Sequence, residues 1–234
     1  MMKHYFLILV SLLVLSSCGN KKIPSVALKN AEDSVSYYIG VHLANQYLLT
    51  NGTDSFININ AFAMGAKDAL DKKVTTDKSQ VLAYIQEYFT KKYYKQADDN
   101  KKAADDFLAK NKEAAGVMTD STGLQYVVER LGTGPKPGPQ DLVTVKYEGS
   151  LLNGEVFDSN MNDSVPAQFH LNQVIPGWSR GLQLMPAGSR YKLFIPPDMA
   201  YGMRPPTEKI GPNSLLIFTV ELLDVKKAEE TKKR

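Results

Sequence analysis

The sequence predicts an α+β protein, in which an all-α N-terminal domain and a long connecting helix precede a C-terminal antiparallel sheet wrapped on a short helix. Apolar residues recur about every 3.6 positions before Gly116 and every second position after it. Between the later strand-like runs, only "WSRGLQLM" (residues 178–185) has helical spacing. Helices that come before a sheet, rather than alternating with its strands, are typical of α+β layer packing.

The first 17 residues are predicted to be a lipoprotein signal peptide that is not part of the fold. Lys3 precedes an apolar run at residues 5–15 that is too short to span a bilayer comfortably. The run ends in "LSSC", which resembles the bacterial lipobox, where the cysteine becomes the first mature residue and carries lipid. Because Cys18 is the only cysteine, it cannot form an internal disulfide, and lipid anchoring to a membrane accounts for it. The alternative is an ordinary secretory signal cleaved nearby.

Residues 18–30 are a polar tether, and residues 31–76 are predicted to form a helical domain. Residues 33–49 have an amphipathic pattern. A second pattern covers residues 60–72, with Asn60 as a plausible cap. The apolar stripes of the two helices are Val35, Ile39, Leu43 and Tyr47, and then Phe62, Ala66, Ala69 and Leu70.

Residues 77–116 are predicted to be one long connecting helix. It starts at "DKSQ", which has capping-box spacing, and Gly116 is a natural stop. Residues 95–116 are rich in Ala, Lys and Asp, with few large apolar side chains. A helix over residues 77–115 would be about 58 Å long at 1.5 Å per residue. Since a polar helix of that length is unsuited to burial, we interpret it as a bridge between two bodies.

Residues 117–226 are predicted to form the sheet domain. Asn153-Gly154 is a hairpin-turn pair. Residues 227–234 are a basic tail, whose simplest interpretation is a solvated charge run. Alternating runs predict strands at "LQYVVER" (124–130), "VTVKYEGSL" (143–151), "SRYKLFIP" (189–196) and "LLIFTVELLDV" (215–225).

Several function classes are disfavoured by composition and spacing. The net charge of +3 is small for 234 residues, and no basic stripe with interleaved aromatics is present, which argues against nucleic-acid binding. The three histidines have neither metal nor triad spacing, and the Gly-x-Gly at residue 132 runs into prolines instead of a helix. We therefore expect no cofactor and no metal. What remains is an aromatic site around Trp178, the only tryptophan.

The C-terminal half closely resembles the FKBP-type peptidyl-prolyl isomerases, over about a hundred residues and in family order. Three stretches carry the resemblance: "VTVKYEGSLLNGEVFDS", "QVIPGWSRGLQLMPAGSRYKLFIPPDMAYG" and "NSLLIFTVELLDV". Residues 31–116 resemble, more loosely, the amino-terminal domain of the dimeric macrophage-infectivity-potentiator-like members, through "DSVSYYIGVHLA" and "AFAMGAKDAL". The resemblance implies an FKBP-like fold, a homodimer formed by the N-terminal helices, and possible inhibition by macrolides of the FKBP family.

The resemblance also implies a pocket for proline. Trp178 would be its floor, and Phe157 and Phe218 its walls. The Ile175 backbone N–H and the Tyr201 hydroxyl would bind peptide carbonyls. Asp158 would approach the twisting amide and bond Tyr147 or a neighbour. The catalytic candidates are Asp158, Tyr201 and Tyr147, and the substrate-binding candidates are Phe157, Val174, Ile175, Trp178, Phe218 and Tyr147.

Two segments depart from the family pattern. Gly211 stands where many relatives have proline, and Pro205-Pro206 where bacterial relatives often have glycine and alanine. These residues belong to a loop, 202–214, that overhangs the pocket in the family. The segment 159–171 varies among relatives, and its Phe169 falls near a family pocket aromatic.

Three functions compete at this stage. The first is an active isomerase that assists folding of exported, proline-containing polypeptides, because uncatalysed rotation takes tens of seconds or more. The second is a chaperone that holds unfolded chains between two arms of a dimer, and the two are compatible. The third is a non-catalytic peptide-binding lipoprotein. For all three, we expect a bacterial cell envelope location, lipid-anchored to the outer membrane and facing the periplasm.

Overall fold

The structure is a computed structural model that describes residues 27–49 and 57–228. The predicted signal peptide, Cys18, most of the tether and residues 229–234 lie outside the described residues. The chain divides into two compact units, one up to Thr75 and the other from Thr76 onward.

The N-terminal unit contains two helices, α1 (Ala31–Leu43) and α2 (Ile59–Leu70). The Asn30 side chain caps α1 by accepting the Asp33 N–H at 2.7 Å. The predicted single helix over residues 33–49 changes character at its end, because Ala44–Leu49 is π-helical. The expected cap at Asn60 is wrong: Asn58 caps α2, accepting the N–H groups of residues 60 and 61.

The long helix α3 spans Lys78–Asn111 and is capped by Asp77, which accepts the Ser79 N–H at 2.8 Å. At 34 residues it is about 51 Å long. The predicted end at residue 116 is therefore too late by about one turn. After Lys112 the chain winds through tight turns, with the Val117 N–H bonded to the Ala114 carbonyl. Gly116, in the left-handed region at φ 81°, leads from these turns into the first strand.

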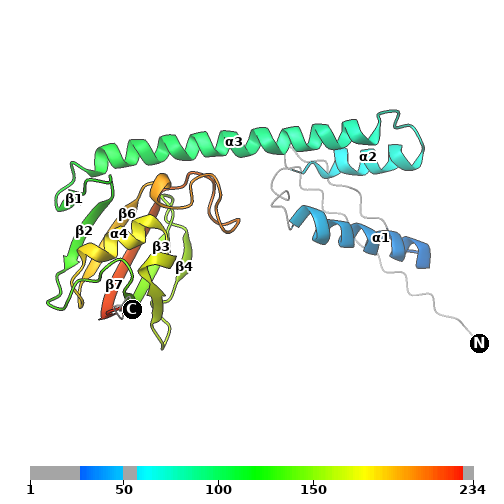
Figure 1. The fold of residues 1–234 in the computed structure, drawn as a ribbon. Helices are drawn as coiled ribbons and strands as arrows, with labels where there is room; N and C mark the ends of the chain where they lie inside the picture. Colours follow the sequence, from blue (N-terminus) through cyan, green and yellow to red (C-terminus); the bar gives the residue numbers. More distant parts are fainter. Residues whose placement is uncertain (1–26, 50–56, 229–234) are drawn as a thin grey trace, which may run out of the picture. The chain divides into compact units, whose positions relative to one another are not determined.

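The C-terminal part is a seven-stranded antiparallel sheet, which confirms the predicted α+β class (Figure 1). The strands occur in the order β1-β2-β6-β7-β3-β4, and β5 also pairs with β3. The sequence did not predict β1 and β5. The strands are β1 (Val117–Thr119), β2 (Gln125–Arg130), β3 (Leu142–Ser150), β4 (Val156–Ser159), β5 (Ala167–His170), β6 (Arg190–Ile195) and β7 (Leu216–Lys226).

Helix α4 (Pro176–Leu184) covers one face of this sheet (Figure 1). Proline at its first position suits a helix start, where the missing N–H costs nothing. Gly177 and Gly181 are buried on its sheet side, and Trp178 and Leu182 enter the core. Short 3₁₀ turns at Leu171–Gln173 and Pro197–Met199 lead into and away from this layer.

The C-terminal half of α3 packs against the sheet domain, so the interpretation of α3 as a bare bridge is wrong for this half. Ala97 and Ala104 are buried, and the Phe107 ring lies 5.6 Å from that of Phe194 in β6. The Gln125 side chain donates to the Leu108 carbonyl at 2.9 Å. The opposite face of α3 carries exposed ion pairs four residues apart, which are typical of a helix face in solvent. No helix among the described residues is long and apolar enough to cross a membrane.

The basic tail begins with a bound segment. Lys227 Nζ lies 2.8 Å from a carboxylate oxygen of Asp141, and the Ala228 N–H donates to the same carboxylate at 3.0 Å. The first two residues of the tail are therefore bound to Asp141, although both remain exposed to solvent, as expected.

Candidate active site

One pocket of about 280 Å³ gathers every residue that the sequence assigned to the site. Its size lies near the lower limit for ligand sites, which suits one residue with its flanking peptide. The residues come from β3, β4, β5, the segment that leads into α4, α4 itself, the loop after β6, and β7. The lining consists of Tyr147, Phe157, Asp158, Phe169, Gln173, Val174, Ile175, Trp178, Tyr201 and Phe218.

Trp178 is the centre of the aromatic cluster. It is 5% exposed, and α4 holds it against the sheet. Its ring centroid lies 5.0 Å from Tyr147, 5.2 Å from Phe218 and 5.5 Å from Phe169, and each pair is close to perpendicular. Such edge-to-face pairs are favourable beyond simple burial. The arrangement makes a rigid apolar surface that could receive a proline ring.

The walls depend on a glycine in β3. Phe157 and Phe218 meet edge to face with ring centroids 5.5 Å apart. A Cβ at Gly149 would lie 2.6 Å from Phe157 Cζ and 2.7 Å from Phe218 Cε1. Only a residue without a side chain leaves room for both rings here, so Gly149 shapes the pocket although it does not line it.

Tyr147 and Asp158 form the polar edge of the pocket. The Tyr147 hydroxyl donates to Asp158 Oδ2 at 2.7 Å. Burial, together with this bond to a carboxylate, raises the pKa of Tyr147 above its usual value. Burial and the nearby charge of Asp158 also raise the pKa of Tyr201. Both phenols therefore remain protonated donors at neutral pH.

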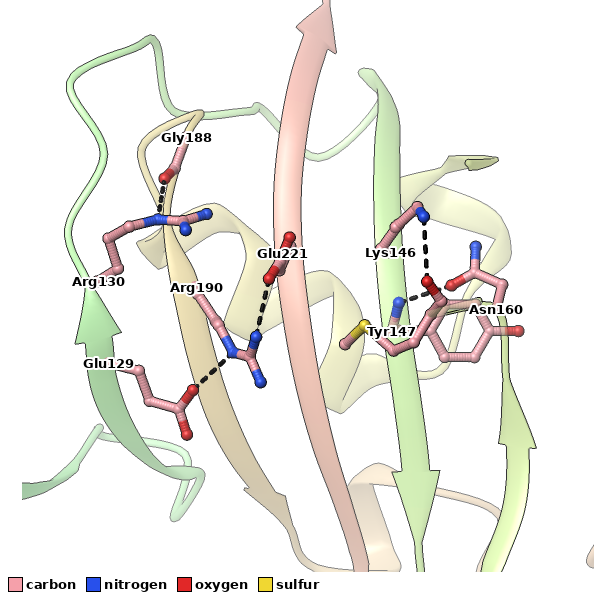
Figure 2. Close-up of polar contacts among 9 residues, drawn as sticks. Glu129, Arg130, Lys146, Tyr147, Asn160, Gly188, Arg190 and Glu221 are labelled. Carbon is pink, nitrogen blue, oxygen red and sulfur yellow. Dashed lines mark hydrogen bonds and ion pairs between the residues drawn. The ribbon is translucent and has the colours of Figure 1, made fainter. Parts of the chain in front are cut away.

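Asn160 fixes the backbone around this pair. It is buried, accepts the Tyr147 N–H at 2.6 Å, and donates to the Val145 carbonyl at 3.2 Å. Figure 2 shows it beside β3, where Lys146 reaches the Met161 carbonyl at 3.0 Å. Because Asp158 lies only two residues before Asn160, these bonds set the position of the carboxylate relative to the Tyr147 hydroxyl.

The start of α4 offers a backbone donor. Ile175 occupies the N-cap position, where the N–H groups of a helix have no partner in the helix itself. Its carbonyl accepts the N–H groups of Trp178 and Ser179, both at 3.0 Å. Among the described residues, the Ile175 N–H donates to no backbone carbonyl. A peptide carbonyl in the pocket could use it.

Gln173 lines the pocket but was not identified from the sequence, and Phe169, which the sequence placed only near a family pocket aromatic, lines it as well. Phe169 lies in β5, whose four residues pair with β3 in a segment that gave no clear strand signal. Its alternation in "AQFH" was the available signal. Among the described residues, no cluster of three or more potential metal ligands occurs.

Comparison with known proteins agrees with this geometry. The family model described as FKBP-type peptidyl-prolyl cis-trans isomerase matches residues 134–223, and the model for the domain amino terminal to it matches residues 32–128. The outer membrane protein MIP of Legionella longbeachae is 41% identical over 212 residues, covering 87% of this chain and 90% of that protein. The isomerase Mip of Coxiella burnetii is 36% identical, covering 89% and 93%.

A solved structure supports the same assignment. The crystal structure of FkpA from Escherichia coli is similar with a TM-score of 0.66 and 33% identity, covering 86% of this chain and 100% of that one. The chain therefore belongs to the FKBP-type peptidyl-prolyl cis-trans isomerase family, whose enzymes rotate the Xaa-Pro bond.

Proposed function

We propose that this isomerase acts in the pocket around Trp178, and that its substrates are proline-containing polypeptides exported from the cytoplasm. One observation supports the proposal most strongly. The candidate residues lie up to about 70 positions apart in the sequence, yet the fold brings them together in one apolar pocket with a polar edge. A pocket made largely of aromatic rings suits a reaction that breaks no covalent bond.

The chemistry requires positioning and an apolar setting, with no nucleophile. The barrier to rotation about a peptide bond is about 18–20 kcal/mol, because the planar amide is stabilised by resonance. Twisting removes that resonance and leaves the carbonyl less charge-separated than in the ground state. A surface that excludes water favours the twisted state, and fixed hydrogen bonds can hold the flanking peptide.

We assign the roles as follows. Trp178 supports the proline ring between Phe157 and Phe218. The Ile175 N–H and the Tyr201 hydroxyl bind carbonyls on either side of the proline. Asp158, held by Tyr147, faces the rotating amide. Val174 extends the apolar lining.

The test is cis–trans exchange on a short Xaa-Pro peptide, measured by NMR with purified chain that starts after Cys18. The wild-type chain should accelerate exchange, and the Asp158→Ala/Trp178→Ala double variant should not. Trp178, as the only tryptophan, also reports occupancy through its fluorescence. A macrolide of the FKBP-binding class should change that fluorescence and inhibit exchange. A folded wild-type chain without acceleration would refute the catalytic role.

We further propose that lipid on Cys18 anchors the protein in the bacterial envelope, at the outer membrane facing the periplasm. The lipobox-like "LSSC" supports this, as does similarity to a protein named an outer membrane protein. Metabolic labelling with an acyl-chain probe tests it. The wild-type chain should take up label and Cys18→Ser should not, whereas equal labelling would contradict lipidation at this residue.

The N-terminal helices support a proposed homodimer. Tyr38 in α1 is 67% exposed, Leu70 in α2 is 84% exposed, and Val35, Ile39 and Met64 are also exposed. So many exposed large apolar side chains on two short helices are unusual for a monomer and indicate an interaction site. Light scattering should give twice the chain mass, and Ile39→Asp should lower it toward the monomer. A monomeric wild-type chain at micromolar concentration would contradict the proposal.

The same surfaces favour chaperone activity as a second function. Trp178→Ala should abolish isomerisation yet still suppress aggregation of an unfolded client. If this variant loses both activities together, the pocket and not the helical domain binds unfolded chains.

A further inference from the structure

Helix α3 holds the loop 202–214 near both of its ends. The Tyr93 hydroxyl donates to the Met203 carbonyl. Two turns further along α3, the Asn100 side chain donates to the Pro212 carbonyl at 2.8 Å. Residues 203 and 204 and 206–209 are exposed, whereas Ile210 and Pro212 are buried. Hydrogen bonds to α3 therefore hold the loop at residues 203 and 212, and most of its exposed residues lie between these two positions.

Asn213 connects this helix to the pocket. It adopts the left-handed conformation at φ 53°. Its N–H donates to the Gly202 carbonyl at 2.7 Å, and its side-chain amide lies 3.4 Å from the Ala97 carbonyl of α3. Gly202 directly follows Tyr201, which lines the pocket. Asn213 therefore links the backbone of α3 to Gly202, the residue next to Tyr201, through two hydrogen bonds.

The close approach of loop and helix explains a departure of the sequence from its family. A Cβ at Gly211 would lie 2.8 Å from Asn100 Nδ2 and 2.9 Å from Gln96 Nε2. Any side chain at this position would push the amide of Asn100 away from the Pro212 carbonyl. Glycine at 211 and the small, buried Ala97 beside it fit the helix against the loop.

We propose that α3 is a positioning element of the proline pocket, and that Asn100, Gly211 and Asn213 fix the loop that carries Tyr201 for peptide binding. This rests on the proposed role of the pocket. A loop that is ordered before the peptide arrives does not lose conformational freedom on binding, so affinity is higher. Release of the loop should weaken binding and leave the rotation step itself nearly unchanged.

The test uses Asn100→Ala, which removes the bond to Pro212, and Gly211→Ala, which displaces the same amide from the loop side. Lys101→Ala is the matched control. It lies next to Asn100, and its amine is paired with Asp105, with both side chains about half exposed. For each variant we would measure KM and kcat by peptide exchange, peptide affinity by Trp178 fluorescence, and Tm.

Asn100→Ala and Gly211→Ala should each raise KM and the fluorescence Kd about three- to tenfold, the loss expected for one hydrogen bond. They should change kcat less than about twofold, and Lys101→Ala should resemble the wild type. Unchanged KM and Kd in both variants, with Tm lowered or not, would overturn the proposal and leave α3 a purely structural support. The fluorescence titration keeps this outcome separate from failure of the proposed catalysis. A wild-type chain that does not accelerate exchange would refute only the proposed catalysis, because the Kd from fluorescence still measures how the loop affects peptide binding.

Discussion

The hydrogen bond between Tyr147 and Asp158 makes the sharpest prediction, because its two partners can be removed singly and together. The phenol donates to the carboxylate at 2.7 Å, in the range of charge-assisted bonds. Bonds to charged groups contribute about 1.5–3 kcal/mol. Asp158 is exposed, and water competes for it, so we take the lower end, roughly 1.5 kcal/mol or slightly more than a factor of ten in rate.

Tyr147→Phe should therefore lower kcat/KM by about tenfold while the edge-to-face contact with Trp178 remains. Asp158→Ala should lower it at least as much. The double variant should lose little beyond Asp158→Ala, because the hydroxyl then has no carboxylate to hold. Peptide exchange by NMR gives each rate constant. Tyr126→Phe is the control, since Tyr126 stacks on Tyr191 and does not line the pocket.

Multiplicative losses in the double variant would refute the reasoning. They would mean that Tyr147 acts on the peptide independently of Asp158. A loss in Tyr147→Phe with a normal rate in Asp158→Ala would refute it as well, since the tyrosine was argued to act through the carboxylate.

Three further predictions concern the framework of the site. Gly149→Ala should lower kcat/KM about tenfold without unfolding the protein, because its Cβ would press on Phe157; a crystal structure with an unmoved ring would contradict this. Asn160→Ala should cost about 2 kcal/mol in urea unfolding, since the Tyr147 N–H loses its acceptor; a cost below about 0.5 kcal/mol would contradict it. Burial alone would raise the pKa of Asp141, but hydrogen bonds from the tail and backbone lower it to about 2. Its stabilisation is therefore complete above about pH 4 and is lost as pH falls from 3.8 toward 2, so Tm should fall more steeply there than in Asp141→Asn.

The aromatic part of the site could be predicted from the sequence because its residues lie in long stretches of family pattern. Trp178 lies in the first turn of a helix. Phe218 lies in an alternating run, which sets the face of the sheet on which its side chain lies, and it pairs with Gly149 of β3. Phe169 could not be assigned in this way. It lies in a strand of four residues that exists because it pairs with the first half of β3, and such short strands have little signal of their own.

The docking of α3 was missed for a different physical reason. Searches for a buried helix face look for large apolar side chains at 3.6-residue spacing. The face of α3 that meets the domain has the right spacing, at Ala97, Asn100 and Ala104, but its residues are small or polar. Small side chains let the helix approach closely, and amides bond the loop carbonyls. The polar composition of α3 therefore correctly indicated a solvent-exposed outward face, but it gave no sign of the face that packs on the domain.

An enzyme that only rotates a bond depends more on the positions of its side chains and backbone donors than on their chemical reactivity. None of the pocket residues has unusual reactivity, so the loss of a single hydrogen bond should cost a factor of about ten, and the contacts should be coupled through shared supports. Asn160 supports Tyr147 from within β3, and α3 supports the neighbour of Tyr201 from outside the sheet. The residues that set activity should therefore include several that never touch the peptide, and they should be found by following hydrogen bonds outward from the pocket.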